Sequence, residues 1–333
     1  MTIMCTRGLP IWTRAVGCVG LLLAFLATAN AEVRPADIAM PTDELGLGPG
    51  YGKRILQFHF DLRGFGGGGF PGEGADGGDR LGFAPRLMVI QPVGSNEAEF
   101  SWGVVHLGHT DAKGDVSTLR LGNPFGAYYW SWRTLSRQIR AGLGFTAPVA
   151  MTRAKPEFDG EVDRWAYAAA SGMRGGTDPW LWSSSTMSGL AHFDAYGRYS
   201  SGFIWGGQVR LASMYGFDDN DGTGEESASK LRRGFHLVAQ ADLDIAIDTT
   251  NVRAQVRGSY VITPTMVPEA DQKEQKDNIV ADAEFRIRLG DADLVLGFTV
   301  PLDEPAGMAF SPGRFWSARV GVSTGTELRL PEE

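Results

Sequence analysis

Apolar and polar residues alternate along segment after segment of this 333-residue chain, and this constrains the fold more than any other feature. A period of two places successive side chains on opposite faces of a β-strand. Phe58 and Phe60, for example, share one face, while His59 lies on the other. About a dozen segments show the pattern: 54–63, 80–90, 98–108, 116–132, 137–147, 188–199, 201–215, 233–248, 251–262, 278–289, 293–302 and 314–324. The sequence therefore predicts an all-β protein of about twelve strands.

One predicted strand, residues 116–132, changes phase along its length. Leu119 and Leu121 are odd-numbered, whereas Tyr128 and Trp130 are even-numbered. The change falls at the sequence Gly-Asn-Pro between them. A β-bulge adds one residue to a strand and absorbs such a shift. We therefore predict one long strand with a bulge.

The connections between the predicted strands alternate between short and long. The long ones are 64–79, 148–187, 216–232, 263–277 and 303–314. Outer-membrane barrels have tight turns on the periplasmic side and long loops outside. The sequence therefore predicts a closed antiparallel transmembrane β-barrel of about 12 strands, with both termini in the periplasm.

The polar faces also favour a membrane barrel over a soluble periplasmic β-protein, which is the alternative. These faces carry many Arg, Asp, Gln and His residues and few Lys, which suits an enclosed, wet lumen. The opposite faces are long and free of charge, as strands that cross a hydrocarbon layer require. We expect the apolar side of each strand to face lipid.

The N-terminal segment is typical of a signal peptide. Arg7 and Arg14 precede an apolar run, and small residues before Glu32 predict cleavage after Ala31. A short membrane anchor is the alternative. Cys5 and Cys18 would both be removed, leaving no thiol for a disulfide or a metal. The predicted organisation is a signal peptide (1–31), a periplasmic segment (32–53), the barrel (54–324) and a C-terminal tail (325–333).

Charge narrows the class of partner. The formal net charge is −8, and it becomes −10 once Arg7 and Arg14 are removed. An acidic chain does not favour nucleic acid, which binds basic surfaces. We expect the outer membrane as the location, membrane lipid and a small solute as partners, and a monomer as the oligomeric state.

The polar faces supply candidates for a constriction in the lumen. A tight turn at 248–251 would place Asp242 opposite Arg257 and Asp244 opposite Gln255. Such charges could select solutes by size and charge, or they could form a structural network that fills the lumen. The candidates are Arg210, Asp242, Asp244, Arg253, Arg257, Asp282, Glu284, Arg286 and Arg288.

The long connection 148–187 is a candidate gate. Val162, Trp165, Ala166 and Ala169 have helical spacing after a candidate N-cap at Asp159. Two further tryptophans follow. A long loop with its own helix could fold into the lumen, or it could pack as an external lid. The gate candidates are Trp165, Trp180 and Trp182.

Catalytic, metal and cofactor sites are not predicted. His106 and His109 would lie on opposite faces of one strand, which is poor geometry for a metal. The acidic stretch 218–226 lacks the calcium-loop spacing and is interpreted as a solvated loop. The chain has no Gly-x-Ser-x-Gly motif. A membrane hydrolase that uses His192 or His236 is a less favoured alternative.

Two short segments carry a family resemblance. They are Leu-Arg-Leu-Gly-Asn-Pro at 119–124 and Gly-Leu-Gly-Phe-Thr-Ala-Pro at 142–148. With them, the chain resembles Gram-negative outer-membrane channel proteins, most nearly the barrels that admit hydrophobic compounds, including fatty-acid transporter-like proteins. The resemblance implies passive passage of a small, hydrophobic solute. A closed barrel with a structural or surface-binding role, acting through its outer loops, is the alternative.

Overall fold

The computed structural model describes twelve stretches of the chain. They are residues 55–67, 79–111, 114–133, 137–151, 166–174 (without 168), 177–199, 202–217, 233–249, 251–262, 277–289, 292–302 and 317–327. The predicted signal peptide, the segment 32–53, the acidic stretch 218–226 and most of the long outer loops lie outside these residues. No helix in the described stretches is long and apolar enough to cross a membrane.

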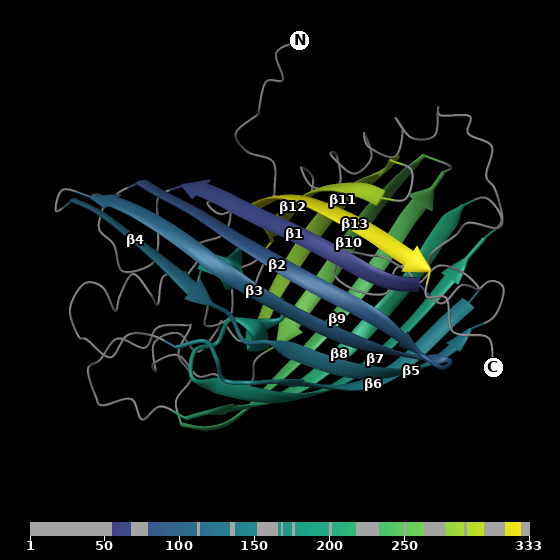
Figure 1. Ribbon diagram of the computed structural model, residues 1–333, viewed down its shortest axis with the longest axis horizontal. Helices are drawn as coiled ribbons and strands as arrows, with labels where there is room; N and C mark the ends of the chain where they lie inside the picture. Colours follow the sequence, from purple (N-terminus) through teal and green to yellow (C-terminus); the bar gives the residue numbers. More distant parts are fainter. Residues whose placement is uncertain are drawn as a thin grey trace, which may run out of the picture.

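The strands form one closed antiparallel sheet (Figure 1). They are β1 (Ile55–Gly67), β2 (Asp79–Val93), β3 (Asn96–Asp111), β4 (Gly114–Leu121), β5 (Phe125–Arg133), β6 (Arg137–Thr146), β7 (Thr186–Arg198), β8 (Phe203–Gly216), β9 (Gly234–Asp248), β10 (Val252–Ile262), β11 (Asp277–Leu289), β12 (Ala292–Pro301) and β13 (Ser317–Glu327). Both β4 and β5 pair with β3, so they are two halves of one strand. The barrel is therefore twelve-stranded, as predicted.

The barrel closes where β1 meets β13. The pairing runs from Ile55↔Glu327 to Gly64↔Ala318, so β13 includes the first residues assigned to the tail. On the lumen side, His59 Nδ1 lies 3.0 Å from Ser323 Oγ. Closure leaves no exposed sheet edge at this seam, which the absence of water in a bilayer demands.

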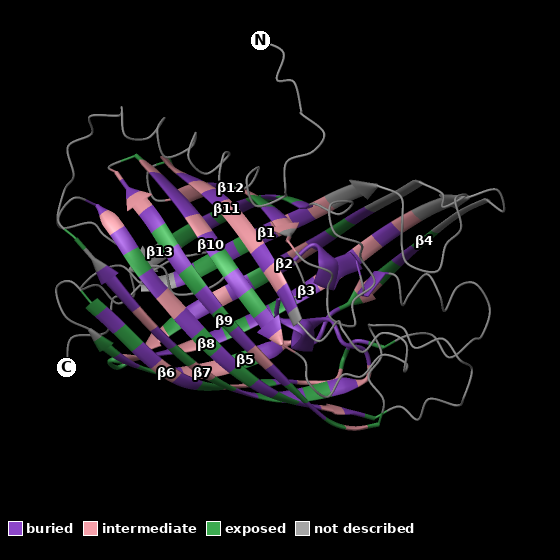
Figure 2. Ribbon diagram, turned by 180° about the vertical axis from the view of Figure 1, so that it is seen from behind, coloured by how far each residue is buried: buried purple, intermediate pink, exposed green. Residues whose placement is uncertain are grey.

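The apolar face of the strands points outward. His59 and Asp61 are each 1% exposed, whereas the intervening Phe60 is 46% exposed. Figure 2 shows the same alternation of buried and exposed positions along β9 and its neighbours, and Leu243 reaches 73% exposure. A soluble barrel would bury these side chains, so the soluble alternative is wrong. A continuous apolar exterior matches a lipid surface.

The predicted bulge is present between β4 and β5. Ser101 pairs with Phe125 and Val104 pairs with Leu121, so three residues, 122–124, oppose two on β3. One of these two, Trp102, donates its indole N–H to Gly122 O at 2.8 Å. The parity change in the sequence is therefore explained by one inserted residue.

The β9–β10 register differs from the prediction by two residues. Arg257 faces Asp244, and Asp242 faces Ser259. The expected pairs Asp242–Arg257 and Asp244–Gln255 are therefore wrong as directly facing pairs. The reason is that the turn lies one residue later than predicted, where Thr249 N donates to Val252 O at 2.9 Å.

Candidate functional site

Part of the long connection between β6 and β7 lies inside the barrel and is called the plug here. It comprises residues 166–174 (without 168) and 177–184, which are all buried. Residues 166–172 are helical where they are described, so the predicted helix is present in part, while Trp165 lies outside the described residues. A short 3₁₀ helix, η1 (Pro179–Leu181), follows. The loop therefore folds inward, and the external-lid alternative is wrong for this part.

The plug crosses the lumen between two opposite strands. Arg174 Nη2 lies 3.3 Å from Asp61 Oδ2 on β1, and Asp178 accepts a hydrogen bond from Arg210 on β8. In a ring of twelve strands, β1 and β8 are six steps apart in either direction. Four residues of chain reach at most about 14 Å. The plug therefore contacts opposite walls through residues only four positions apart, and it bridges the lumen between them.

Backbone groups of the plug also bind wall side chains. Met173 O accepts hydrogen bonds from Arg63 Nη1 at 3.1 Å and from Ser317 Oγ at 2.6 Å. Asp178 N donates to Gln240 Oε1 at 3.1 Å. Asp178 has a left-handed backbone with φ 53°, which Asp tolerates better than most residues. The plug is thus held in one defined position.

Asn123, in the bulge, fastens the plug to the wall. Its amide nitrogen donates to Trp180 O at 3.0 Å and to Ser183 O at 2.8 Å. Its Oδ1 accepts from Val149 N at 3.0 Å and from Ala150 N at 2.8 Å. The buried Asn123 side chain therefore forms hydrogen bonds both with the backbone just after β6 and with the backbone just before β7. The Asn of the Gly-Asn-Pro sequence has a structural role that the sequence alone did not reveal.

Trp182 fits against two glycines of the wall. A Cβ at Gly103 would lie 2.7 Å from the Trp182 ring, and a Cβ at Gly122 would lie 2.9 Å from it. Real Cβ atoms do not approach so closely, so both positions need glycine to receive the indole. Of the three gate candidates, Trp180 and Trp182 are thus in the lumen, each 2% exposed.

The nine charged candidates all lie on the lumen side of their strands. Arg257 Nε pairs with Asp244 Oδ1 at 2.7 Å, while Glu284 contacts Arg286 and Arg319. Other contacts include those of Arg253 and Arg288 with Asp248, Asp242 with Gln208 and Gln240, Asp282 with Thr299, and Arg210 with Asp178. All except Arg210–Asp178 join wall to wall. These contacts fit the alternative in which the charges form a structural network that fills the lumen.

The buried charges are balanced. The described buried side chains include nine arginines, namely 63, 86, 140, 174, 210, 253, 257, 286 and 319. They also include nine acids, namely Asp61, Glu97, Glu99, Asp178, Asp194, Asp242, Asp244, Asp248 and Glu284. A buried ion needs an opposite partner to offset its desolvation. The arginines and acids among the described buried side chains therefore cancel in formal charge.

A second ionic cluster was missed by the sequence analysis. Arg140 on β6 donates to Asp194 Oδ2 at 2.7 Å and to Glu97 Oε2 at 2.9 Å. His192 Nε2 lies 2.7 Å from Asp194, and the Tyr129 ring lies 4.8 Å from the Arg140 guanidinium. The alternation of apolar and polar residues in 137–147 and 188–199 is weak, so the inward faces of these two strands were hard to identify. The inward parity of Arg140 and Asp194 was the available signal.

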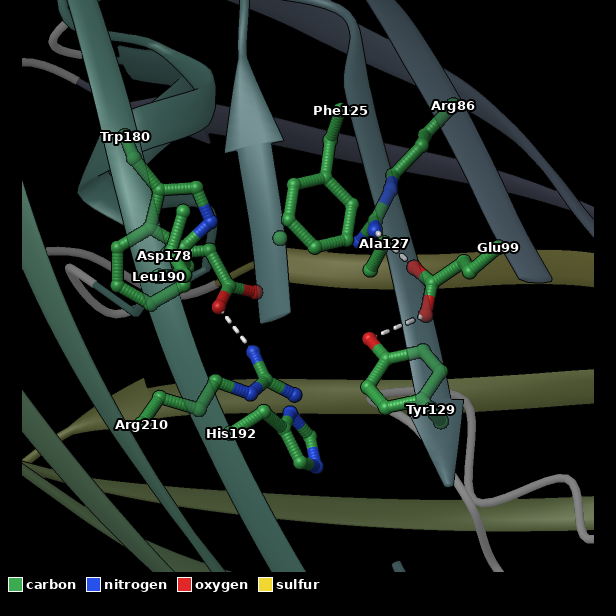
Figure 3. A pocket seen from close by; sticks show the side chains of 11 residues that line it. Arg86, Glu99, Phe125, Ala127, Tyr129, Asp178, Trp180, Leu190, His192 and Arg210 are labelled. Atoms are coloured by element: carbon green, nitrogen blue, oxygen red, sulfur yellow. Dashed lines mark hydrogen bonds and ion pairs between the residues drawn. The ribbon is translucent and has the colours of Figure 1, made fainter. Parts of the chain in front are cut away.

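A small cavity remains between the plug and the wall (Figure 3). Its volume is about 20 Å³, which is room for about one water. One side of this cavity is apolar and the other is ionic. The lining residues are Arg86, Glu99, Phe125, Ala127, Tyr129, Gly144, Asp178, Trp180, Leu190, His192 and Arg210.

Comparison with known proteins shows the fold. No family model matches the chain, and no curated protein matches its sequence. An outer membrane channel from Pseudomonas putida F1 superposes with a TM-score of 0.51 at 9% identity, covering 84% of this chain and 100% of that one. This chain has the fold of an outer-membrane β-barrel.

Two further solved structures are more distant in shape. The toluene transporter TodX of Pseudomonas putida has a TM-score of 0.40 at 9% identity, over 89% of this chain and 95% of its own. The KdgM porin in complex with disordered oligogalacturonate has a TM-score of 0.39 at 8% identity, over 81% and 98%.

Proposed function

We propose that the protein is an outer-membrane channel for a small organic solute and that the plug is its gate, closed in this structure. The observation that carries the proposal is the way in which the plug is held. It crosses the lumen as a separate segment, fixed by two ion pairs and by Asn123. It is not a strand of the wall.

The wall does not depend on the plug for its closure. The strands pair continuously around the barrel, and most of the candidate charges pair between wall strands. Removing the plug would therefore leave a closed sheet around a wet passage. Such a passage suits passive movement of a small molecule, as the named channel from Pseudomonas putida F1 also suggests.

A second candidate is a closed barrel with a structural or surface-binding role. The balanced set of nine buried arginines and nine buried acids favours it, because such a network can fill a narrow lumen permanently. The two candidates differ in one respect. Only the channel should conduct once the plug is released.

Single-channel conductance in planar lipid bilayers separates them. The test variant carries Arg174→Gln and Asp178→Asn, which weaken both cross-lumen ion pairs. The matched control carries Arg253→Gln and Asp248→Asn, the same change in a pair within the wall. We expect brief, rare openings in the wild type and a steady open current in the test variant alone.

The open probability should rise at least about tenfold, because each charged hydrogen bond contributes about 1.5–3 kcal/mol. Folding of both variants is checked by resistance to unfolding in detergent. A folded test variant that stays silent would support the closed-barrel candidate and overturn the gate.

A further inference from the structure

Arg210 holds a particular place among the lumen arginines. It projects from the middle of β8, and the one carboxylate it contacts in the described part of the chain belongs to Asp178 of the plug. It also donates a hydrogen bond to the neutral amide oxygen of Gln208, at 2.9 Å. When the plug leaves, Arg210 therefore loses its counter-ion.

The other cross-lumen pair behaves differently. Asp61 contacts Arg63 at 3.1 Å and Arg319 at 3.9 Å as well as Arg174 of the plug. Its charge stays balanced by the wall after the plug has moved. Opening therefore removes the one carboxylate that Arg210 contacts among the described residues, whereas Asp61 keeps two arginine partners on the wall.

The Arg210–Asp178 contact also uses only part of the bonding capacity of the two groups. Arg210 Nη1 donates to Asp178 Oδ1, whereas Arg210 Nε and Asp178 Oδ2 have no hydrogen-bond partner within the described residues. Both side chains are more than nine-tenths buried. Guanidinium binds carboxylate best through two parallel hydrogen bonds. A carboxylate that can orient itself could therefore bind Arg210 better than Asp178 does.

The surroundings of Arg210 show what else such a ligand would contact. In Figure 3 the guanidinium of Arg210 lies between Asp178 and His192, at the edge of the cavity. Phe125, Trp180 and Leu190 supply apolar surface to the same cavity. The acids on the wall already have partners, since Glu99 accepts from Tyr129 at 2.9 Å and lies 3.7 Å from Arg86.

We propose that Arg210 binds the carboxylate of the transported solute, and that Asp178 occupies this place while the gate is closed. The solute class is a small organic monocarboxylate with a flat apolar body. Its arrival exchanges one carboxylate for another, so the plug is released without leaving a buried cation alone. This inference rests on the proposed channel function and adds the substrate class and the trigger.

The test is uptake by proteoliposomes of three probes of nearly equal size: benzoate, benzamide and benzylammonium. We expect the wild type to take up benzoate about tenfold faster than benzamide, since charged hydrogen bonds are about twice as strong as neutral ones. Asp178→Asn should raise the uptake of all probes and keep the preference for benzoate. Arg210→Gln should abolish that preference while benzamide still passes.

Arg253→Gln is the matched control, because it removes the same charge from the lumen wall away from the plug. It should keep the preference for benzoate. A preference that survives in Arg210→Gln, or that disappears equally in Arg253→Gln, overturns the assignment of the carboxylate site. Failure of every probe to enter with Asp178→Asn would instead contradict the channel function itself.

Discussion

The inward faces of the two sides of the barrel make different kinds of contact. Along β9, β10 and β11 the inward charges pair with neighbouring strands, as Arg257 does with Asp244. Along β3 and the β4–β5 bulge the inward positions include the bare glycines Gly103 and Gly122, which are covered by Trp182 of the plug. The charges on the first side are paired within the wall, whereas the glycines on the second side are covered by the plug. Stability should therefore depend on the first side and occupancy of the lumen on the second.

The largest loss of stability should follow a substitution on the side formed by β9, β10 and β11. Asp244→Ala removes the acceptor of Arg257 at 2.7 Å, Gln255 at 2.8 Å and Tyr196 at 3.0 Å. Breaking a buried ion pair in this way costs about 3 kcal/mol. Urea unfolding in detergent micelles should show this loss of stability. Conductance measurements in planar bilayers should show no increase in current over the wild type. Asp178→Ala should lower stability far less, and equal losses would contradict the distinction between the two sides.

An intermediate effect is expected at the bulge. Asn123→Asp keeps an acceptor for Val149 N and Ala150 N but removes the donor to Trp180 O and Ser183 O. Two buried carbonyls then lose a partner, at a cost of about 2 kcal/mol. Hydrogen exchange should show faster opening of residues 177–185, with unchanged protection of β9 and β10. Equal protection of the plug in the wild type and in Asn123→Asp would show that Asn123 does not hold the plug in place.

The smallest effect should follow a single added methyl group. Gly122→Ala places a Cβ 2.9 Å from the Trp182 ring, so the indole must move, at a cost of about 1 kcal/mol. Tryptophan fluorescence should shift to the red as water reaches the ring. Gly258→Ala is the control, because a Cβ there meets nothing within 4 Å. A shift in the control but not in the test variant would refute the proposed fit.

Local pattern predicted the wall well, and it did so for a physical reason. Each strand buries alternate residues, so strand number, inward face and even the bulge were readable from parity. The register of β9 and β10 was not, because the hydrogen bond between Thr249 N and Val252 O sets the turn and periodicity does not report it. The charges expected to line the lumen do so, but whether they select a solute stays a prediction.

The contacts of the plug were beyond the reach of sequence pattern. Arg174 and Asp61 are 113 residues apart, and no periodicity links them. The same holds for Trp182 and the two glycines that receive it, since a glycine in a strand has several possible explanations. The sequence identified Trp180, Trp182 and part of the helix at 166–172, from the unusual length of the loop and from helical spacing, but none of their contacts.

The short span between Arg174 and Asp178 has a mechanical consequence. Because it is anchored on walls that face each other, it limits how far β1 and β8 can move apart while both ion pairs are intact. Loss of either ion pair would remove that limit. Under the proposed gating function, lateral pressure that changes the separation of β1 and β8 would therefore change how easily the plug moves.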